Sequence, residues 1–82
     1  MLRNNQDVQN DKNLKMLLGQ LYFEKKDFEK ALPLLQYFVN QTEKVPKEIL
    51  YELSFCYYKN NIYDKAIQGF RKLSILRNII KK

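Results

Sequence analysis

Apolar residues recur every three or four positions along most of the chain, in four stretches separated by short polar connectors. This is the spacing of one face of an α-helix, whereas a half-buried strand would alternate with a period of two. The four apolar faces are Leu14, Leu17, Leu18, Leu21 and Tyr22; Phe28, Ala31, Leu32, Leu35, Phe38 and Val39; Ile49, Leu50, Leu53, Cys56 and Tyr57; and Tyr63, Ala66, Ile67, Phe70 and Leu73. The pattern predicts an all-α fold with helices over 13–25, 28–41, 46–59 and 62–80.

The connectors carry residues that begin or end helices. Asp27 is a suitable N-cap for the second helix, and Pro46 suits the first turn of the third. The pair Asn60-Asn61 predicts a turn before the fourth helix, because Asn tolerates the left-handed backbone conformation. Pro33 removes one backbone hydrogen bond inside the second helix and is expected to bend it near its start.

An internal repeat relates the two halves of the chain. A shift of 35 residues aligns Leu18-Gly19-x-x-Tyr22 with Leu53-Ser54-x-x-Tyr57. The same shift aligns further pairs, namely Phe28 with Tyr63, Lys30-Ala31 with Lys65-Ala66, Leu35 with Phe70, and Phe38 with Leu73. The first two helices therefore form one hairpin and the last two form its copy. The small residues at the repeated positions predict places where two helix backbones approach closely: Gly19, Ser54, Ala31 and Ala66.

The repeat resembles the tetratricopeptide repeat (TPR), a helix-turn-helix unit of ~34 residues with the signature W-x2-L-G-x2-Y, then A-x3-F, then P. Here the copies read Lys15-x2-Leu18-Gly19-x2-Tyr22 with Ala31-x3-Leu35, and Leu50-x2-Leu53-Ser54-x2-Tyr57 with Ala66-x3-Phe70. The signature Trp is replaced in both copies, Ser54 stands for the second Gly, and Pro46 lies a few residues beyond the usual Pro. The alternative is an unrelated four-helix bundle, which has no need of a repeat.

The resemblance implies two tandem hairpins in a short right-handed α-solenoid. We expect a flexible polar tail over 1–12, a first hairpin over 13–45 and a second hairpin over 46–82 with an extended basic helix. The family serves in protein–protein interaction, so the resemblance implies a scaffold, adaptor or chaperone-like module, either complete or part of a longer array. An array needs about three repeats for stability, and this chain offers two.

In this family the first helix of each hairpin lines a concave groove. The corresponding candidate residues are Met16, Gln20 and Phe23 on the first helix, with Glu24 beside them, and Tyr51, Phe55 and Tyr58 on the third, with Lys59 beside them. Large apolar side chains there favour a ligand with apolar anchors, either an amphipathic helix or an extended peptide. The alternative is that these aromatic rings pack against an adjacent element. Some members clamp a C-terminal carboxylate, but Met16 and Gln20 occupy places where that clamp needs a cation and an amide.

Composition argues against catalysis. The 82 residues include no His and one Cys, which excludes the usual zinc sites and histidine-based catalytic groups. Cys56 lies on a packing face, where an inert buried thiol is expected. No Gly-rich phosphate loop is present, so we predict a non-enzymatic chain without metal or cofactor. No apolar run reaches the ~20 residues of a membrane span and Met1 to Asp11 lack a signal-peptide core, so we expect a cytoplasmic protein.

Basic charge is concentrated near the C-terminal end. The net charge is +6, and residues 61–82 contribute six cations, Lys65, Arg71, Lys72, Arg77, Lys81 and Lys82, against Asp64 alone. The simplest interpretation is a solvated helix end, where cations complement the helix dipole. The alternative function is binding of nucleic acid or an anionic surface. At ~100° per residue the cations scatter around the helix, whereas a membrane helix would segregate them, so we expect neither partner.

The fourth helix changes its apolar face near its end. Tyr63 to Leu73 place their apolar residues on one side, whereas Ile75, Leu76, Ile79 and Ile80 centre on the opposite side. A helix that changes its apolar face is expected to meet a new neighbour. We therefore predict that Leu73, Ile75, Leu76, Ile79 and Ile80 form a surface for a homodimer or for the next repeat of a longer array. The alternative is a frayed helix end.

Overall fold

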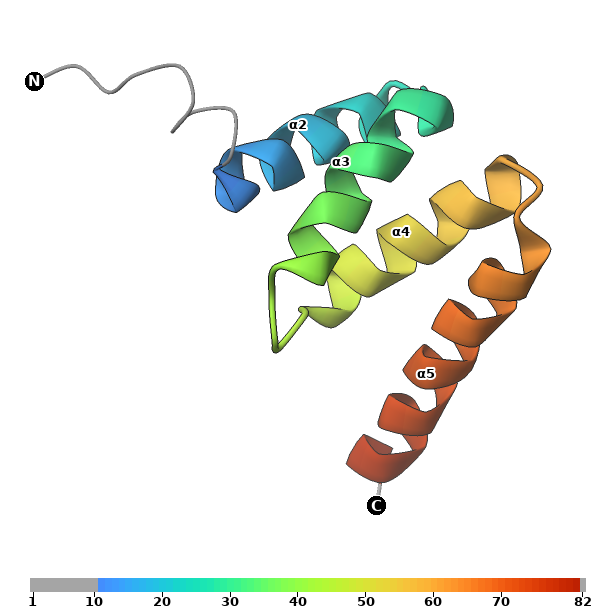
Figure 1. The fold of residues 1–82 in the computed structure, drawn as a ribbon. Coiled ribbons are helices and arrows are strands. Elements are labelled where there is room, and N and C mark those ends of the chain that lie inside the picture. Colours follow the sequence, from blue (N-terminus) through green and yellow to red (C-terminus); the bar gives the residue numbers. More distant parts are fainter. Residues whose placement is uncertain (1–10, 82) are drawn as a thin grey trace, which may run out of the picture.

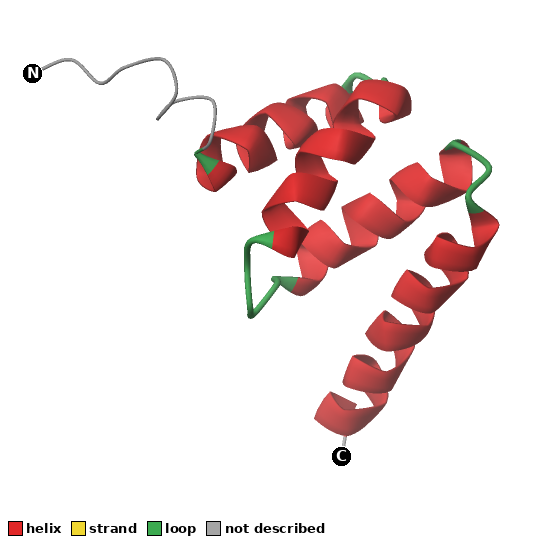
Figure 2. Cartoon of the chain, in the orientation of Figure 1, coloured by secondary structure: helices red, strands yellow, loops and turns green. Residues whose placement is uncertain are grey.

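The computed structural model describes residues 11–81, with side chains for residues 11–74. It contains four helices, α2 (Lys12–Glu24), α3 (Phe28–Asn40), α4 (Lys47–Lys59) and α5 (Tyr63–Lys81). The chain reverses direction at each connector, as Figure 1 shows, and Figure 2 shows helices joined only by loops over this range. The all-α fold of two helical hairpins is confirmed, and every helix lies within one residue of the bounds expected at each end.

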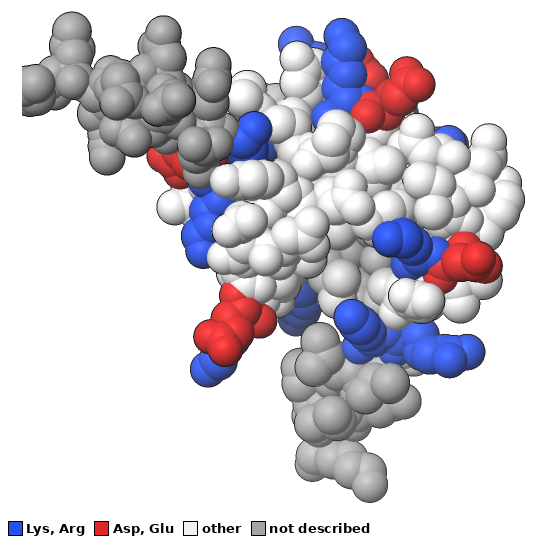
Figure 3. Space-filling view, viewed as in Figure 1, with Lys and Arg blue, Asp and Glu red and all other residues white. Residues whose placement is uncertain are grey.

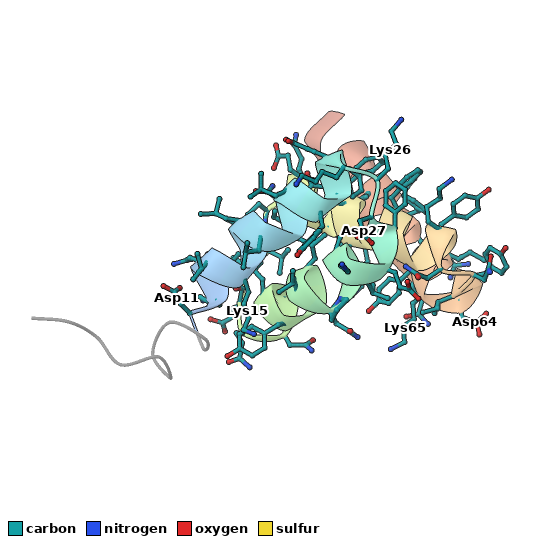
Figure 4. All side chains as sticks on the ribbon, turned by 90° about the horizontal axis from the view of Figure 1, so that it is seen from above. Asp11, Lys15, Lys26, Asp27, Asp64 and Lys65 are labelled. Atoms are coloured by element: carbon teal, nitrogen blue, oxygen red, sulfur yellow. The ribbon has the colours of Figure 1, made fainter. Side chains whose placement is uncertain are left out.

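Aspartate residues cap the first two helices (Figure 4). The Asp11 carboxylate accepts hydrogen bonds from the backbone N–H of Asn13 at 2.9 Å and of Leu14 at 3.3 Å. The Asp27 carboxylate accepts one from the N–H of Lys30 at 3.3 Å, as the sequence predicted. Each cap satisfies backbone donors that have no partner inside the helix.

The first hairpin begins earlier than expected, because Asp11 is the cap of α2 and Lys12 is its first residue. The Lys12 ammonium donates to the backbone carbonyl of Gln41 at 3.1 Å, which links the start of α2 to the end of α3. Asp11 and Lys12, which were expected in the tail, are therefore the cap and the first residue of α2. The rest of that tail, residues 1–10, lies outside the described residues.

Both hairpin turns use the same backbone geometry. Lys26 and Asn61, which are 35 positions apart, have φ angles of 64° and 65°. After α2, the N–H of Asp27 donates to Tyr22 O at 2.8 Å and that of Lys26 to Phe23 O at 3.0 Å. This pair of bonds is the Schellman motif, which ends a helix with one left-handed residue. The same bonds recur after α4, from Ile62 to Tyr57 O at 2.8 Å and from Asn61 to Tyr58 O at 3.0 Å.

The core lies at the junction of the two hairpins. Its buried residues all come from the two central helices: Ala31, Leu35 and Phe38 from α3, and Ile49, Leu53 and Cys56 from α4. Helix α3 packs on both α2 and α4, while α2 also touches α4. The Asn60 amide strengthens this junction, because its Nδ2 donates to Phe28 O at 3.1 Å across the hairpins and to Cys56 O at 2.8 Å.

The outer helices bury less than their sequences indicated. Leu17, Leu18 and Leu21 were expected on the packing face of the first helix, but they are 53%, 40% and 54% exposed. Ile67 of α5 is likewise exposed. Within the described residues α2 packs mainly on α3 and more lightly on α4, so part of its apolar face has no neighbour. Helical periodicity identifies such a face without specifying what covers it.

Small residues mark the close approaches, as the repeat predicted. Gly19, Ala31, Ser54 and Ala66 are all buried. A Cβ added to Gly19 would lie 2.9 Å from the Leu35 side chain. In the second hairpin the close approach joins Ser54 and Gly69, because a Cβ on Gly69 would overlap the Ser54 hydroxyl and lie 2.8 Å from its Cβ. Gly69 of α5 corresponds to Leu34 of α3. The second hairpin therefore pairs Ser54 with Gly69 at the positions where the first hairpin pairs Gly19 with Leu34.

We predict that Lys26→Gly stabilises the protein by about 1 kcal/mol, because glycine adopts the left-handed conformation without the clash of a Cβ. Asn61→Gly should gain less, since Asn tolerates this conformation and the Asn61 side chain accepts a hydrogen bond from Tyr63 Oη at 2.8 Å. Urea unfolding of the two variants would measure both changes. Lys25→Gly, at a residue with φ of −80°, is the control and should not stabilise. An equal gain in stability from Lys25→Gly would show that the gain does not come from the left-handed conformation of residue 26.

We predict that Gly69→Ala destabilises the protein by about 1–3 kcal/mol through overpacking, although Ala is the better helix former. Ser54→Gly should relieve the overlap, so that Gly69→Ala costs clearly less in that background. A double-mutant cycle by chemical denaturation measures the coupling. Additive effects of the two substitutions would show that the helices separate freely and that the close approach imposes no constraint.

Candidate functional site

Seven aromatic rings form a connected series of contacts across the helices. This aromatic chain consists of Phe23, Phe28, Tyr51, Phe55, Tyr58, Tyr63 and Phe70. Phe55 is its centre, since its ring centroid lies 5.3 Å from Phe28, 5.8 Å from Phe23, 6.1 Å from Tyr58 and 6.2 Å from Tyr51. Contacts at these distances stabilise a structure beyond their buried area. The aromatic chain therefore links the two hairpins.

The expected groove residues divide into two groups. Met16 and Phe23 of α2 pack against the core, and Gln20 Nε2 donates to Glu52 Oε1 of α4 at 3.2 Å. These three residues help join the hairpins. Tyr51 and Tyr58 of α4 are instead 49% and 50% exposed. The structure thus brings Phe23, Tyr51, Phe55 and Tyr58 into one series of ring contacts, and the exposed members of this set are the two tyrosines of α4.

Three further rings extend this series beyond the groove residues expected from the sequence: Phe28, Tyr63 and Phe70, whose ring centroid lies 6.1 Å from that of Tyr51. Phe28 was counted only as a packing residue, and its ring contacts both Phe23 and Phe55. Tyr63 was also counted as packing, but it is half-exposed and contacts the Tyr58 ring edge-on at 5.9 Å. The shift of 35 residues pairs Phe28 with Tyr63. That alignment was the signal that could have marked both positions as equivalent parts of one surface.

Charged groups border the aromatic chain. The Lys59 ammonium lies 5.7 Å from the Phe28 ring centre and 5.8 Å from that of Phe55, within the range of cation–π attraction. Burial raises the pKa of Glu52, the hydrogen bond from Gln20 lowers it, and the nearby carboxylates of Glu24 and Glu48 raise it further. Lys59 therefore places a cation on the rings, and Glu52 lies near other carboxylates where α4 meets α2.

The single thiol has no chemical role that its environment supports. Cys56 is fully buried and unpaired, and burial raises its pKa to about 12. The thiol is therefore protonated at neutral pH, whereas a nucleophile or metal ligand must be a thiolate. Among residues 11–74, no cluster of three or more His, Cys, Asp or Glu side chains could hold a metal ion. The described helices also include none with the length and apolar character required to cross a membrane.

A second surface feature lies on another side of α4. An open cavity of about 170 Å³, here called the α3–α5 cavity, is lined by residues of three helices: Val39 of α3, Leu50, Leu53, Ser54 and Tyr57 of α4, and Lys65, Gln68, Gly69 and Lys72 of α5. None of the expected groove residues lines it. From the sequence alone, Lys65 and Lys72 were expected only among the scattered cations of the last helix. The cavity depends on tertiary packing, because its walls come from three different helices.

The expected self-association surface is described only in part. Leu73 is half-buried, and α5 remains helical through Lys81. The side chains of Ile75, Leu76, Ile79 and Ile80 lie outside the described residues. The prediction of a new neighbour at this end of α5 therefore stays a prediction.

One protein family matches most of this chain. The sequence model of the family described as "Anaphase-promoting complex, cyclosome, subunit 3" matches residues 3–73. The chain belongs to this family. It is a family of TPR-type repeats, so the resemblance drawn from the repeated motifs is confirmed, and the match covers both hairpins into α5. Neither a curated protein nor a solved structure matches the chain. Repeats of this type generally act as protein-interaction modules, which agrees with the interaction class expected from the sequence.

We predict a graded loss of stability along α4. Leu53→Ala removes a buried core side chain and should lower the free energy of unfolding by about 2–5 kcal/mol, as is usual when a buried leucine is truncated. Phe55→Ala, at a half-buried ring that contacts four others, should cost about 2 kcal/mol. Tyr58→Ala should cost about 0.5 kcal/mol, because half of its surface already faces solvent. Guanidinium unfolding of the three variants gives the order. If Tyr58→Ala proved as costly as Phe55→Ala, Tyr58 would be a core residue.

Proposed function

We propose that this chain is a protein-interaction module that binds a partner on the exposed tyrosines of the aromatic chain. The observation that carries the proposal is the row formed by Tyr51, Tyr58 and Tyr63, each about half-exposed, over the half-buried ring of Phe55. Tyrosine offers a large apolar ring with a polar end and loses little entropy when it is fixed. Exposed aromatic side chains supported by a fixed layer beneath are typical of interface hot spots.

The ligand is an amphipathic helix or an extended peptide with apolar anchors. The rings supply apolar contact area, Lys59 offers a cation near the C-terminal end of α4, and Glu48 and Glu52 offer carboxylates in its N-terminal half. A partner helix with apolar residues at i, i+3 and i+4 presents a stripe that could cover this row. The proposed groove therefore keeps Tyr51, Phe55 and Tyr58 as contact residues. Met16, Gln20 and Phe23 support it from α2.

The family description supports a role inside a larger assembly. The matching family is described as a subunit of the anaphase-promoting complex, and we infer that this chain is likewise an assembly module in a multi-subunit complex. Two hairpins are fewer than the ~three repeats that an array needs for stability. The proposal therefore includes a further repeat or a second copy covering the end of α5, through Leu73 and the apolar residues between 75 and 80.

The test is affinity capture with quantitative mass spectrometry, using the full chain and Tyr51→Ala/Tyr58→Ala. Partners of the tyrosine surface should be captured at least about tenfold less by the double variant, since two hot-spot residues at ~1–2 kcal/mol each give this factor. The matched control is Ile67→Ala, which truncates an apolar side chain that is 57% exposed on α5. Circular dichroism confirms that both variants fold. Equal capture by all three proteins would show that the tyrosine row is not the binding surface.

A further inference from the structure

The α3–α5 cavity has an apolar floor and a basic rim. Its floor consists of Leu53, Ser54 and Gly69, which are buried, and the Ser54 hydroxyl donates to Leu50 O at 2.8 Å. The Ser54 hydroxyl therefore already has a hydrogen-bond acceptor, so the floor does not require a polar ligand. Val39, Leu50 and Tyr57 form half-buried walls. The rim is exposed and consists of Lys65, Gln68 and Lys72.

The internal repeat shows that the residues around this space differ between the two hairpins. Gly69 and Lys72 of α5 correspond to Leu34 and Tyr37 of α3. In the first hairpin, Leu34 packs beside Gly19, where a Cβ would lie 3.2 Å from the Leu34 Cβ. In the second hairpin Gly69 lies against the Ser54 side chain. Lys72 at the rim therefore has no basic counterpart in the first hairpin.

The volume suits one large apolar side chain. The cavity measures about 170 Å³, whereas an engineered cavity of ~150 Å³ lined by apolar residues binds benzene. A leucine, isoleucine or phenylalanine side chain from a partner could therefore enter it. Apolar lining with a few polar groups at the edge is the usual composition of a small binding site.

The charges at the rim specify the partner's polar groups. Lys65 and Lys72 both carry ammonium groups at the cavity edge, and no described acidic residue lines it. Within residues 11–74 neither lysine forms an ion pair, although the Lys65 ammonium lies 5.9 Å from the Tyr57 ring centre. Figure 4 shows Lys65 at the start of α5, and Figure 3 shows basic side chains at several places around the molecule, including the lower right of this face. This arrangement is complementary to carboxylates.

The spacing of the two lysines gives the spacing of the carboxylates. Seven residues of α-helix separate Lys65 and Lys72 by ~10 Å along the axis. An extended chain advances ~13 Å in four residues, and its residues i, i+2 and i+4 face the same side. Two acidic residues four positions apart would therefore face both lysines, whose flexible side chains span the ~3 Å difference. An apolar residue between them would face the cavity, and the Gln68 amide lies between the two lysines to hydrogen-bond the segment's backbone.

We propose that the α3–α5 cavity is a second docking site, which binds an extended acidic peptide with the pattern acidic–x–apolar–x–acidic. It uses Leu50, Leu53 and Tyr57 on a face of α4 different from the one that carries Tyr51, Phe55 and Tyr58. At 100° per residue the centres of these two faces are ~120° apart. The site is therefore independent of the tyrosine row, and the two surfaces can engage different segments at the same time.

Fluorescence anisotropy tests this site with a labelled synthetic peptide, Gly-Ser-Asp-Ala-Leu-Ala-Asp-Ser-Gly, and the full 82-residue chain. The expected result is saturable binding that weakens with added salt. Replacing both Asp residues of the peptide by Asn, or its Leu by Ser, should weaken binding by about tenfold or more. Lys72→Ala should weaken binding by about threefold, the size expected for one rim ion pair. Gln68→Trp, which places a large side chain at the rim, should block it.

Arg71→Ala is the matched control, because it removes one exposed positive charge from the neighbouring position outside the cavity. It should leave the affinity within experimental error of the unmodified chain. An equal loss from Arg71→Ala and Lys72→Ala would reduce the effect to net charge and overturn the proposal. Tyr51→Ala/Tyr58→Ala should bind the peptide normally, which separates this site from the proposed tyrosine surface.

Three further outcomes would replace the acidic peptide by another occupant and so overturn the proposal. A second copy is the occupant if Gln68→Trp lowers the oligomeric state in sedimentation experiments while the peptide does not bind. The start of this chain is the occupant if the peptide binds only after residues 1–10 are deleted. Phosphate is the recognised group if a single-stranded oligonucleotide binds through Lys65 and Lys72 and the peptide fails to compete.

Discussion

The contact between α3 and α4 is the interaction on which the rest of the structure depends. These two helices come from different hairpins, and together they provide the six side chains of the main buried cluster. Leu35 and Cys56 are fully buried within it, and the Asn60 amide closes one end by bonding to Phe28 O and Cys56 O. Burying apolar surface here stabilises both hairpins at once, since neither could bury these residues alone. The two hairpins are therefore joined into one folded unit by the contact between α3 and α4.

Close approach of the helices within each hairpin is a second constraint, and the two copies meet it differently. Gly19 admits the Leu35 side chain in the first hairpin, whereas Ser54 and Gly69 face one another in the second. Packing in a protein interior leaves few gaps, so a small residue on one helix is matched by the size of its neighbour on the other. The Ser54–Gly69 pair lies in the floor of a surface cavity. Gly69 and Lys72 line this α3–α5 cavity, at the positions where the first hairpin has Leu34 and Tyr37.

Helix α4 carries residues of both candidate binding surfaces, and it packs on α5 of its own hairpin and on α3 and α2 of the other. One face holds Leu53 and Cys56 in the core. A second face carries Phe55 with the exposed Tyr51 and Tyr58, whose rings continue to α2, α3 and α5. A third face lines the α3–α5 cavity with Leu50 and Tyr57. A partner bound at either surface would contact residues positioned by the α3–α4 junction, so binding and stability of the pair of hairpins are coupled.

The sequence by itself determined the local structure and the repeat. Apolar spacing gave all four helices, Asp27 and Asn61 marked a cap and a turn, and the shift of 35 residues identified the TPR-type hairpins. These features depend on residues within a few positions of one another or on a comparison of the chain with itself. Only the tertiary structure decided which apolar faces are covered. Leu17, Leu18 and Leu21 satisfy a helical pattern and yet remain exposed, while Phe23 and Gln20 join α2 to α4. The α3–α5 cavity likewise requires Val39, Leu53 and Lys65 to meet from three helices. Periodicity states that a face is apolar, but its burial depends on where other helices lie, and that is a property of packing between residues far apart in sequence.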